Sequence, residues 1–206
     1  TAGSRVYIHE KIYDKVLEGA VEKLSKLKMG NALDETSDIG AIISEEQLKR
    51  TLYYMDIAKK NSSTKILHGG NQSKGGEYKD GFYYEPTLLS GLPVSSPVCQ
   101  EEVFGPVACA IPFKSFDEVM KSANDTQFGL SAVLWTKDLS RALQFVDEIE
   151  AGFVQVNQCV APRANVSYGG IKMSGLGKEY AFDSMMNHFT QSKTVLINRG
   201  KSSTDV

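Results

Sequence analysis

Over residues 115–156 the sequence alternates between helical periodicity and short apolar segments, and this alternation restricts the fold more than any other feature of the chain. Helices are expected over about 115–124 and 138–149, and strands over about 130–135 and 153–156. A strand–helix–strand order at this spacing is typical of parallel strands joined by right-handed crossovers. We therefore expect an α/β fold: an open, mostly parallel sheet with helices on both faces.

A second group of segments extends the same pattern toward the N-terminus. Ser44 is followed three residues later by Gln47, which resembles a capping box at the start of a helix that continues to about Lys60. The other expected elements are a helix of about five turns over 12–27 and strands over 6–9, 64–68 and 107–113. Since 206 residues suffice for one substantial core but not for two large domains, most of the chain is expected to form one domain.

Charge and cysteine content exclude several classes of function. A net charge of −2 with scattered lysines gives no electrostatic reason to bind nucleic acid or an anionic membrane. No apolar run reaches the ~20 residues that a membrane-spanning helix needs, and the start of the chain lacks the apolar core of a signal peptide, so a cytoplasmic or organelle-matrix location is expected. The three cysteines and three histidines show neither a Cys-x-x-Cys pair nor metal-ligand spacing. We therefore expect free thiols and no metal site.

The stretch from Gln100 to Pro106 carries the groups best suited to chemistry. Two adjacent carboxylates, an aromatic ring and a Gly-Pro turn stand between two apolar runs. The Glu102 carboxylate can accept hydrogen bonds from two hydroxyls, as a ribose diol offers, while the Phe104 ring can press against a flat ring. The alternative interpretation is a solvated acidic turn that leads into a strand.

The chain resembles the aldehyde dehydrogenase superfamily over nearly its whole length. Five of its segments match motifs of that family in order and spacing. They are Thr1–Arg5 (the end of the nucleophile motif Gly-Gln-x-Cys-x-Ala-Gly-x-Arg), Gly30–Gly40 (the Gly-Asn/Asp-Pro loop), Glu101–Pro106, Gly152–Asn157 and Tyr168–Glu179. The family's catalytic cysteine aligns immediately before Thr1, and its general-base glutamate and dinucleotide-binding domain align further upstream. We therefore expect the C-terminal part of an enzyme, without its nucleophile and general base and inactive alone.

The resemblance implies an NAD(P)-dependent aldehyde dehydrogenase. In that family a cysteine thiolate attacks the aldehyde to form a thiohemiacetal, hydride passes to the cofactor, and water hydrolyses the resulting thioester to the carboxylic acid. The cofactor, NAD or NADP, would be bound mostly by the N-terminal region. An alternative from another class is a non-catalytic assembly module built on the same fold, and the presence of Glu102 and Phe104 argues against it.

The resemblance also assigns candidate site residues. Glu102 matches the glutamate that binds the nicotinamide ribose hydroxyls, and Phe104 matches the aromatic residue that limits the position of the nicotinamide. Glu101 is expected to have a structural role, in a salt bridge or at a helix end. Glu179 matches a glutamate that relays protons to the general base, with a carboxylate favoured at a helix N-terminus as the competing interpretation.

The substrate pocket is expected at the end of a parallel strand, where α/β sheets place their ligands. The resemblance implies that the loop after this strand lines the substrate tunnel. The candidate pocket residues are Asn157, Gln158, Cys159, Val160 and Tyr168. Tyr168 stands where the family usually has phenylalanine, and core packing is the alternative interpretation for its ring.

Two regions are expected, a catalytic domain over 1–188 and an oligomerisation strand with a tail over 189–206. Lys193–Asn198 is a short β-rich segment, and in the family resembled such a strand joins the sheet of a neighbouring subunit. We therefore expect a homo-oligomer, a dimer or a tetramer, that acts on an aldehyde.

Overall fold

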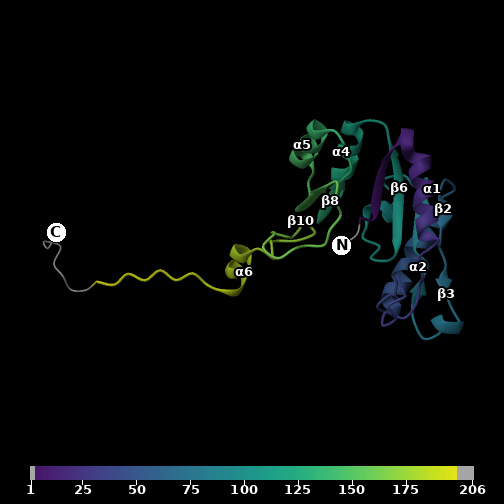
Figure 1. Ribbon diagram of the computed structural model, residues 1–206, viewed down its shortest axis with the longest axis horizontal. Coiled ribbons are helices and arrows are strands. Elements are labelled where there is room, and N and C mark those ends of the chain that lie inside the picture. Colours follow the sequence, from purple (N-terminus) through teal and green to yellow (C-terminus); the bar gives the residue numbers. More distant parts are fainter. Residues whose placement is uncertain (1–2, 199–206) are drawn as a thin grey trace.

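The computed structural model describes residues 3–198, which form a four-stranded sheet, three two-stranded pairs and the helices that cover them (Figure 1). Thr1 and Ala2, which begin the first matched motif, and the polar tail beyond Asn198 lie outside the described residues. No helix within residues 3–198 is long and apolar enough to cross a membrane. The same part of the chain contains no group of three or more His, Cys, Asp or Glu side chains that could hold a metal ion.

The four-stranded sheet forms the centre of the larger part of the molecule. Its strands stand in the order β1 (Arg5–His9), β6 (Val107–Phe113), β5 (Thr87–Ser90) and β2 (Lys65–His68). The first three are parallel, and β2, at one edge, runs antiparallel. The apolar run of β6 is continuous because a central strand is buried on both faces. The expected open, mostly parallel sheet is confirmed.

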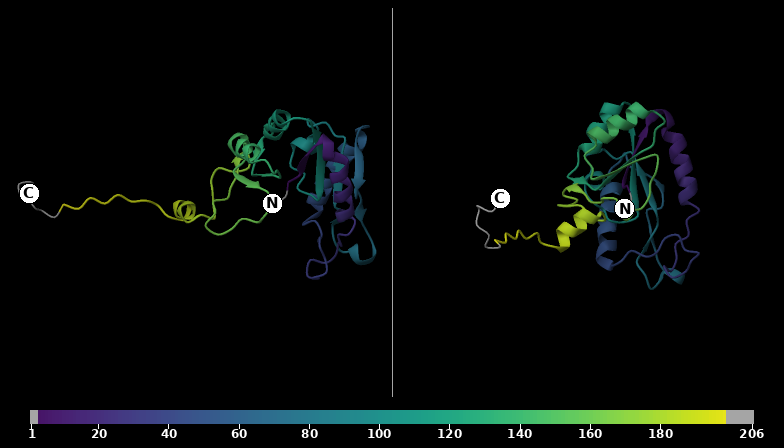
Figure 2. Two further views of the ribbon diagram at one scale, coloured as in Figure 1. Left: turned by 45° about the horizontal axis from the view of Figure 1, so that its top comes forward. Right: turned by 60° about the vertical axis from the view of Figure 1, so that its left-hand side comes forward.

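Helices cover both faces of this sheet, as expected (Figure 2). α1 (Tyr13–Leu24) packs on the face that carries Ala110, and α2 (Glu45–Lys60) packs on the face that carries Cys109 and Ile111. Neighbouring residues of β6 reach different helices because side chains alternate between the two faces of a strand.

The two helices differ from the sequence expectation at their ends. The hydroxyl of Ser44 accepts a hydrogen bond from the Gln47 N–H at 3.2 Å and caps α2 as predicted, but the Gln47 side chain turns elsewhere and does not complete a capping box. α1 ends at Leu24 and not near residue 27, because the chain turns there toward a β-bridge between Met29 and Ile39.

Shorter elements connect these layers. They are η1 (Glu10–Ile12), β3 (Gln72–Ser73), η2 (Gly76–Tyr78), β4 (Tyr83–Tyr84) and α3 (Pro97–Gln100). α3 leads directly into residues 101–106, called the acidic loop below. Buried side chains of α2, α3, β5 and β6 form the larger core cluster, which also includes Val103 of the acidic loop.

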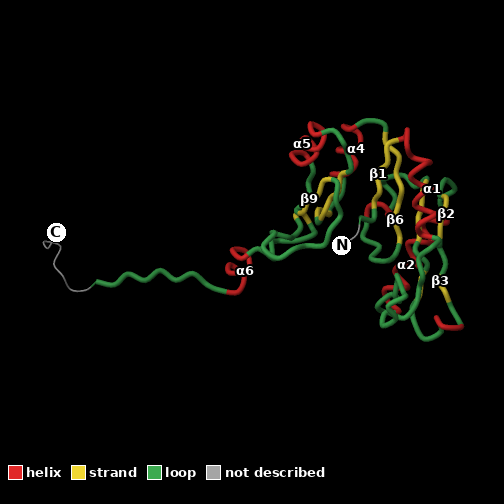
Figure 3. The backbone as a smooth tube through the Cα atoms, in the orientation of Figure 1, coloured by secondary structure: helices red, strands yellow, loops and turns green. Residues whose placement is uncertain are grey.

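The segment with the regular alternation forms a smaller layer beside the sheet (Figure 3). Its elements are α4 (Phe116–Asn124), β7 (Phe128–Gly129), β8 (Ser131–Leu134), α5 (Leu139–Glu148), β9 (Phe153–Val156), β10 (Ile171–Lys172) and α6 (Phe182–Phe189). Ser115 and Asp138 cap α4 and α5 by accepting backbone N–H bonds at 3.2 and 3.1 Å. β8 and β9 are parallel, as expected, but within residues 3–198 they pair with each other and not with β6.

The two layers meet where β1 faces the C-terminal end of α4. The Arg5 guanidinium donates to the carbonyls of Ser122 and Ala123 at 3.4 and 3.1 Å, and the Tyr7 hydroxyl donates to the Ser122 carbonyl at 3.0 Å. A cation is favourable at this end of a helix because it satisfies the last carbonyls and opposes the helix dipole. Arg5 and Tyr7 thereby join β1 to the smaller layer, whose strands β8 and β9 pair with each other within residues 3–198.

Beyond α6 the chain runs away from the rest of the molecule as an extended segment (Figure 1). Lys193–Asn198 forms no strand within the described residues. Val195, Leu196 and Ile197 are exposed. The predicted boundary after residue 188 lies one residue before the end of α6 and stays a prediction, as does the pairing of this segment with another subunit.

Candidate functional site

The acidic loop is held against one face of α2. Gln47, on the first turn of the helix, donates from its side-chain amide to the carbonyls of Val103 and Phe104 at 2.9 and 2.8 Å. The Arg50 guanidinium donates twice to the Glu102 carbonyl, at 3.1 and 2.6 Å. Residues three apart lie on the same side of a helix, so both side chains reach the loop from one face. Three consecutive loop carbonyls are therefore fixed.

The two adjacent glutamates of this loop have different surroundings. Glu101 forms the C-cap of α3, and its carboxylate accepts a hydrogen bond from the buried Tyr54 hydroxyl at 2.6 Å. Burial and this hydrogen bond raise the pKa of Tyr54 above its ordinary value. The Glu102 carboxylate is exposed and has no hydrogen-bond or ion-pair partner within residues 3–198. Glu101 is thus tied to the fold at a helix end, while the Glu102 carboxylate remains available to a ligand.

Phe104 has an unusual backbone conformation. Its φ of +57° lies in the left-handed region, which costs a residue other than glycine roughly 1–2 kcal/mol. The next residue, Gly105, packs so closely on α2 that a Cβ at this position would overlap the Thr51 hydroxyl. The Phe104 side chain is nevertheless 70% exposed. A fixed and strained backbone therefore presents an accessible aromatic ring.

The second group of candidates begins where β9 ends. Asn157, with a φ of +54°, exchanges two hydrogen bonds with the Thr136 backbone. Its Oδ1 accepts from the Thr136 N–H at 2.8 Å, and its Nδ2 donates to the Thr136 carbonyl at 2.7 Å. The side-chain amide thus extends the β8–β9 pairing and fixes the start of the following loop. A direct contact of Asn157 with a substrate stays a prediction.

The loop that follows Asn157 contains three more candidates. Gln158, Cys159 and Val160 are exposed, and the Cys159 thiol is free. The buried Gln155 side chain accepts the Val160 N–H at 2.9 Å, which turns the chain back across the end of β9. The loop is therefore anchored at its start and open to solvent beyond it, as a pocket lining would need.

Tyr168 and Glu179 are brought together by their backbones. The Tyr168 N–H donates to the Glu179 carbonyl at 3.0 Å, and the Glu179 N–H donates to the Tyr168 carbonyl at 2.7 Å. The Tyr168 ring contacts the rings of Phe153 and Tyr180 edge-on, with centroids 5.2 and 5.8 Å away, so packing accounts for part of its role. The Glu179 carboxylate is exposed and has no partner within the described residues. A relay requires a second acid beside it, so that role also stays a prediction.

Lys178 joins the two ends of this region. Its ammonium donates to the carbonyl of Gly152, just before β9, at 2.9 Å and to the carbonyl of Gly169, just before β10, at 2.6 Å. A Cβ at Gly152 would overlap the Gly169 carbonyl, so the two segments approach closely because position 152 has no side chain. Lys178 therefore holds the strand that carries Asn157 next to the segment that carries Tyr168.

The residues that support the candidates are harder to find in the sequence than the candidates themselves. The sequence predicts Gln47 only as a capping residue and gives no role to Arg50, Tyr54 or Lys178. Gln47, Arg50 and Tyr54 are spaced along one face of α2, and this spacing is a usable signal, since residues three, four and seven apart share a face. Nothing local shows that this face meets the acidic loop.

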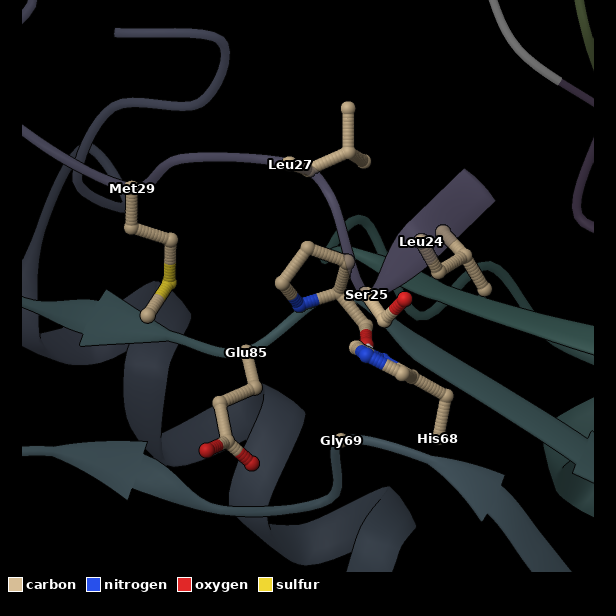
Figure 4. Close-up of a pocket in the computed structure, with 8 residues that line it drawn as sticks. Leu24, Ser25, Leu27, Met29, His68, Gly69 and Glu85 are labelled. Atoms are coloured by element: carbon tan, nitrogen blue, oxygen red, sulfur yellow. Dashed lines mark hydrogen bonds between the residues drawn. The ribbon is translucent and has the colours of Figure 1, made fainter. Parts of the chain in front are cut away.

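None of the candidate residues lines the small cavity drawn in Figure 4. Its volume is about 200 Å³, and it lies between the end of α1 and the strands β2 and β5. Its lining residues are Leu24, Ser25, Leu27, Met29, His68, Gly69, Glu85 and Pro86. His68 is engaged there, with its Nδ1 2.8 Å from the Pro86 carbonyl. This cavity is not part of the candidate site.

Known proteins resemble the chain in both sequence and structure. The model of the aldehyde dehydrogenase family matches residues 1–195. Over 96% of the chain, an aldehyde dehydrogenase of Rhodospirillum rubrum is 39% identical and aldehyde dehydrogenase B of Escherichia coli strain K12 is 38% identical. A solved structure of betaine aldehyde dehydrogenase from Staphylococcus aureus in complex with NAD+ matches 100% of the chain with a TM-score of 0.90 at 31% identity. The chain spans about two fifths of these relatives: 39%, 38% and 40% of their lengths, respectively.

Proposed function

Because the chain belongs to the aldehyde dehydrogenase family, we propose that the protein containing it oxidises an aldehyde to a carboxylic acid with NAD or NADP as its cofactor. The observation that carries the proposal is the acidic loop. It combines an available carboxylate and an exposed aromatic ring on a backbone that α2 holds in place. A solvated acidic turn requires neither the strained Phe104 nor three bound carbonyls.

The acidic loop fits a nicotinamide nucleotide chemically. Ionised carboxylate oxygens only accept hydrogen bonds, and the Glu102 carboxylate can accept both donors of a ribose diol. The exposed Phe104 ring offers an apolar surface that limits where the nicotinamide ring can lie. When bound, the cofactor supplies the acceptor for the hydride removed from the aldehyde. Glu102 and Phe104 act by orienting that acceptor. The NAD+ complex of the Staphylococcus aureus relative supports NAD as the cofactor.

The substrate end of the site is proposed at the loop after β9. The start of this loop is anchored to the Gln155 side chain, and the side chains exposed there are those of Gln158, Cys159 and Val160. They supply the lining that distinguishes one aldehyde from another. Tyr168 adds one aromatic wall, which its contacts with neighbouring rings keep in place. Glu179, paired with Tyr168 through the backbone, is the proposed proton relay.

The proposed nucleophile is a cysteine thiol, and neither buried thiol of this chain can fill that role. Cys99 and Cys109 are 3% exposed, so an aldehyde in solvent cannot reach them. The neighbouring Cys99 thiol and burial raise the pKa of the Cys109 thiol, which keeps it protonated and unreactive. Cys159 is exposed, but it is not followed by the Ala-Gly-x-Arg run that follows the nucleophile in the family resembled. Residues 1–206 alone are therefore proposed to be inactive, with the thiohemiacetal and thioester formed on a cysteine elsewhere in the protein.

Assembly and location complete the proposal. The exposed Val195, Leu196 and Ile197 suit a strand that completes its hydrogen bonds in the sheet of a second subunit, giving a dimer or a tetramer. The three cysteines are free thiols in the described structure. Free thiols favour a reducing compartment such as the cytoplasm or an organelle matrix.

Steady-state oxidation of a panel of aldehydes by the full-length protein tests this function. The expected result is aldehyde-dependent formation of NADH or NADPH, detected by absorbance. For any variant of the candidate site, Lys49→Gln is a matched control that should keep the activity of the unaltered protein. Lys49 is exposed on α2 and pairs only with Glu45 among the described residues. If the full-length protein reduces neither cofactor with any aldehyde yet assembles normally, the non-catalytic module becomes the better interpretation.

A further inference from the structure

The conformation of Phe104 and the side chain of Gln47 are linked by geometry. The carbonyls of Val103 and Phe104 are consecutive, and peptide units are planar, so the two torsions of Phe104 set their relative direction. One amide nitrogen of Gln47 donates to both carbonyls, at 2.9 and 2.8 Å. It can do so only while Phe104 keeps the torsions that turn both carbonyls toward α2.

We propose that Gln47 is a positioning residue for the nicotinamide nucleotide: it holds Phe104 in the left-handed conformation and thereby fixes where the Glu102 carboxylate and the Phe104 ring are presented. This inference rests on the proposed function. Both Gln47 bonds go to backbone atoms, so the clamp leaves the two loop side chains available to the cofactor.

Gln47 is itself well anchored, as a positioning residue must be. Its N–H donates to the Ser44 hydroxyl at 3.2 Å, and its carbonyl accepts the hydroxyl of the buried Thr51 at 3.1 Å. Thr51 also lies against Gly105, the residue after Phe104. The donor and the loop therefore share one rigid support, and little freedom remains to be lost when the clamp forms.

Arg50 restrains the loop at a different place. It binds the Glu102 carbonyl, which comes before Phe104 in the chain. This bond therefore does not depend on the Phe104 torsions. Loss of Gln47 consequently leaves the loop attached to α2 but releases Phe104. The strain at Phe104 then favours another conformation, and the binding-competent conformation becomes the minor one.

Hydrogen exchange in the cofactor-free, full-length protein tests the clamp directly. Gln47→Leu removes both donors, and Gln47→Glu keeps the size but places acceptors against two carbonyls. We expect the amides of Val107 and Thr87, which donate to the Gly105 and Pro106 carbonyls at 2.8 and 2.7 Å, to exchange roughly tenfold faster in both variants, since two hydrogen bonds of the loop are lost together. Lys49→Gln, on the same helix, should leave these rates unchanged. Equal rates in wild type and both Gln47 variants overturn the proposal.

Binding of NADH, followed by its fluorescence, separates positioning from direct contact. The apparent Kd rises as the competent conformation is depopulated, so we expect binding to weaken about tenfold together with the faster exchange. The KM for NAD+ should rise in parallel, while kcat and the aldehyde KM change less than about twofold. Weaker binding with unchanged exchange overturns the proposal, because Gln47 would then act through a direct contact with the cofactor.

The same experiment distinguishes failure of the inference from failure of the proposed function. If the unaltered protein binds no NADH, the proposed function is wrong, and faster exchange in the variants still supports Gln47 as the residue that holds the loop. Phe104→Gly supplies a further test, because glycine adopts a positive φ without strain. Replacing Gln47 in that background should accelerate exchange by a smaller factor than in wild type. The same factor in both backgrounds contradicts the link between Gln47 and the Phe104 torsion.

Discussion

Lys178→Met offers a quantitative test of how the region around Tyr168 is held. The substitution removes the ammonium that binds the carbonyls of Gly152 and Gly169, at 2.9 and 2.6 Å. Methionine keeps an unbranched stem, so the contact of the side chain with Gly169 is largely retained. The loss is therefore mainly that of two charge-assisted hydrogen bonds.

The expected magnitude follows from the environment of these bonds. A hydrogen bond to a charged group contributes about 1.5–3 kcal/mol. Lys178 is half-buried, so water can replace part of each bond and the two together are worth roughly 2 kcal/mol. Since about 1.4 kcal/mol corresponds to a tenfold change, local opening should become about 30-fold more frequent.

Hydrogen exchange at the amides of Tyr168 and Glu179 measures this opening, because each donates to the other's carbonyl. Their protection should fall about 30-fold in Lys178→Met, by the energy worked out above. Lys137→Met, at an exposed lysine, should leave both amides unchanged. Protection within about threefold of wild type would show that the two bonds of Lys178 do not hold this region.

Four further perturbations address the site, the assembly and the core. Glu102→Gln in the full-length protein should lower turnover and weaken NADH binding, by about 1–2 kcal/mol for a hydrogen bond that loses its charge, without changing thermal stability; unchanged kinetics would remove Glu102 from the site. Deletion of residues 193–206 should lower the molar mass in light scattering to that of a smaller assembly, and an unchanged mass would place the subunit contact elsewhere. Gly152→Ala should destabilise the fold, by about 1–3 kcal/mol in urea denaturation, because its Cβ would overlap the Gly169 carbonyl. Tyr84→Phe should stabilise the protein by about 1 kcal/mol in the same assay, since the buried Tyr84 hydroxyl has no partner among the described residues. Burial raises the pKa of Tyr84 from 10.0 to about 12, so the wild type should lose more stability than Tyr84→Phe as the pH rises from 10.0 to 12, and an equal loss would contradict this.

Local signals predicted α4, β8, α5 and β9 of the smaller layer closely, whereas β7, β10 and α6 were not assigned bounds. The predicted and observed bounds of β9 coincide, and α4 and α5 begin directly after the capping residues Ser115 and Asp138. Capping and periodicity are properties of a few neighbouring residues, so they can be read without knowledge of the rest of the fold. α1 was less well predicted, because the turn after Leu24 depends on a bridge formed by residues further along the chain.

The candidate site was predictable as residues and not as an arrangement. Glu102 and Phe104 stand in a motif that resemblance identifies. The bonds from Gln47 and Arg50 to their loop join positions far apart in the sequence, and no periodicity or propensity encodes such a contact. The bond from Arg5 to the Ala123 carbonyl, which joins β1 to α4, is equally non-local.

The structure of the full-length protein with NAD+ bound is the decisive test of the roles proposed for Glu102 and Phe104. We expect the Glu102 carboxylate within hydrogen-bond distance of the nicotinamide ribose hydroxyls and the Phe104 ring beside the nicotinamide, with the acidic loop still bound to Gln47 and Arg50. A cofactor bound with its nicotinamide ribose away from Glu102 would contradict these roles.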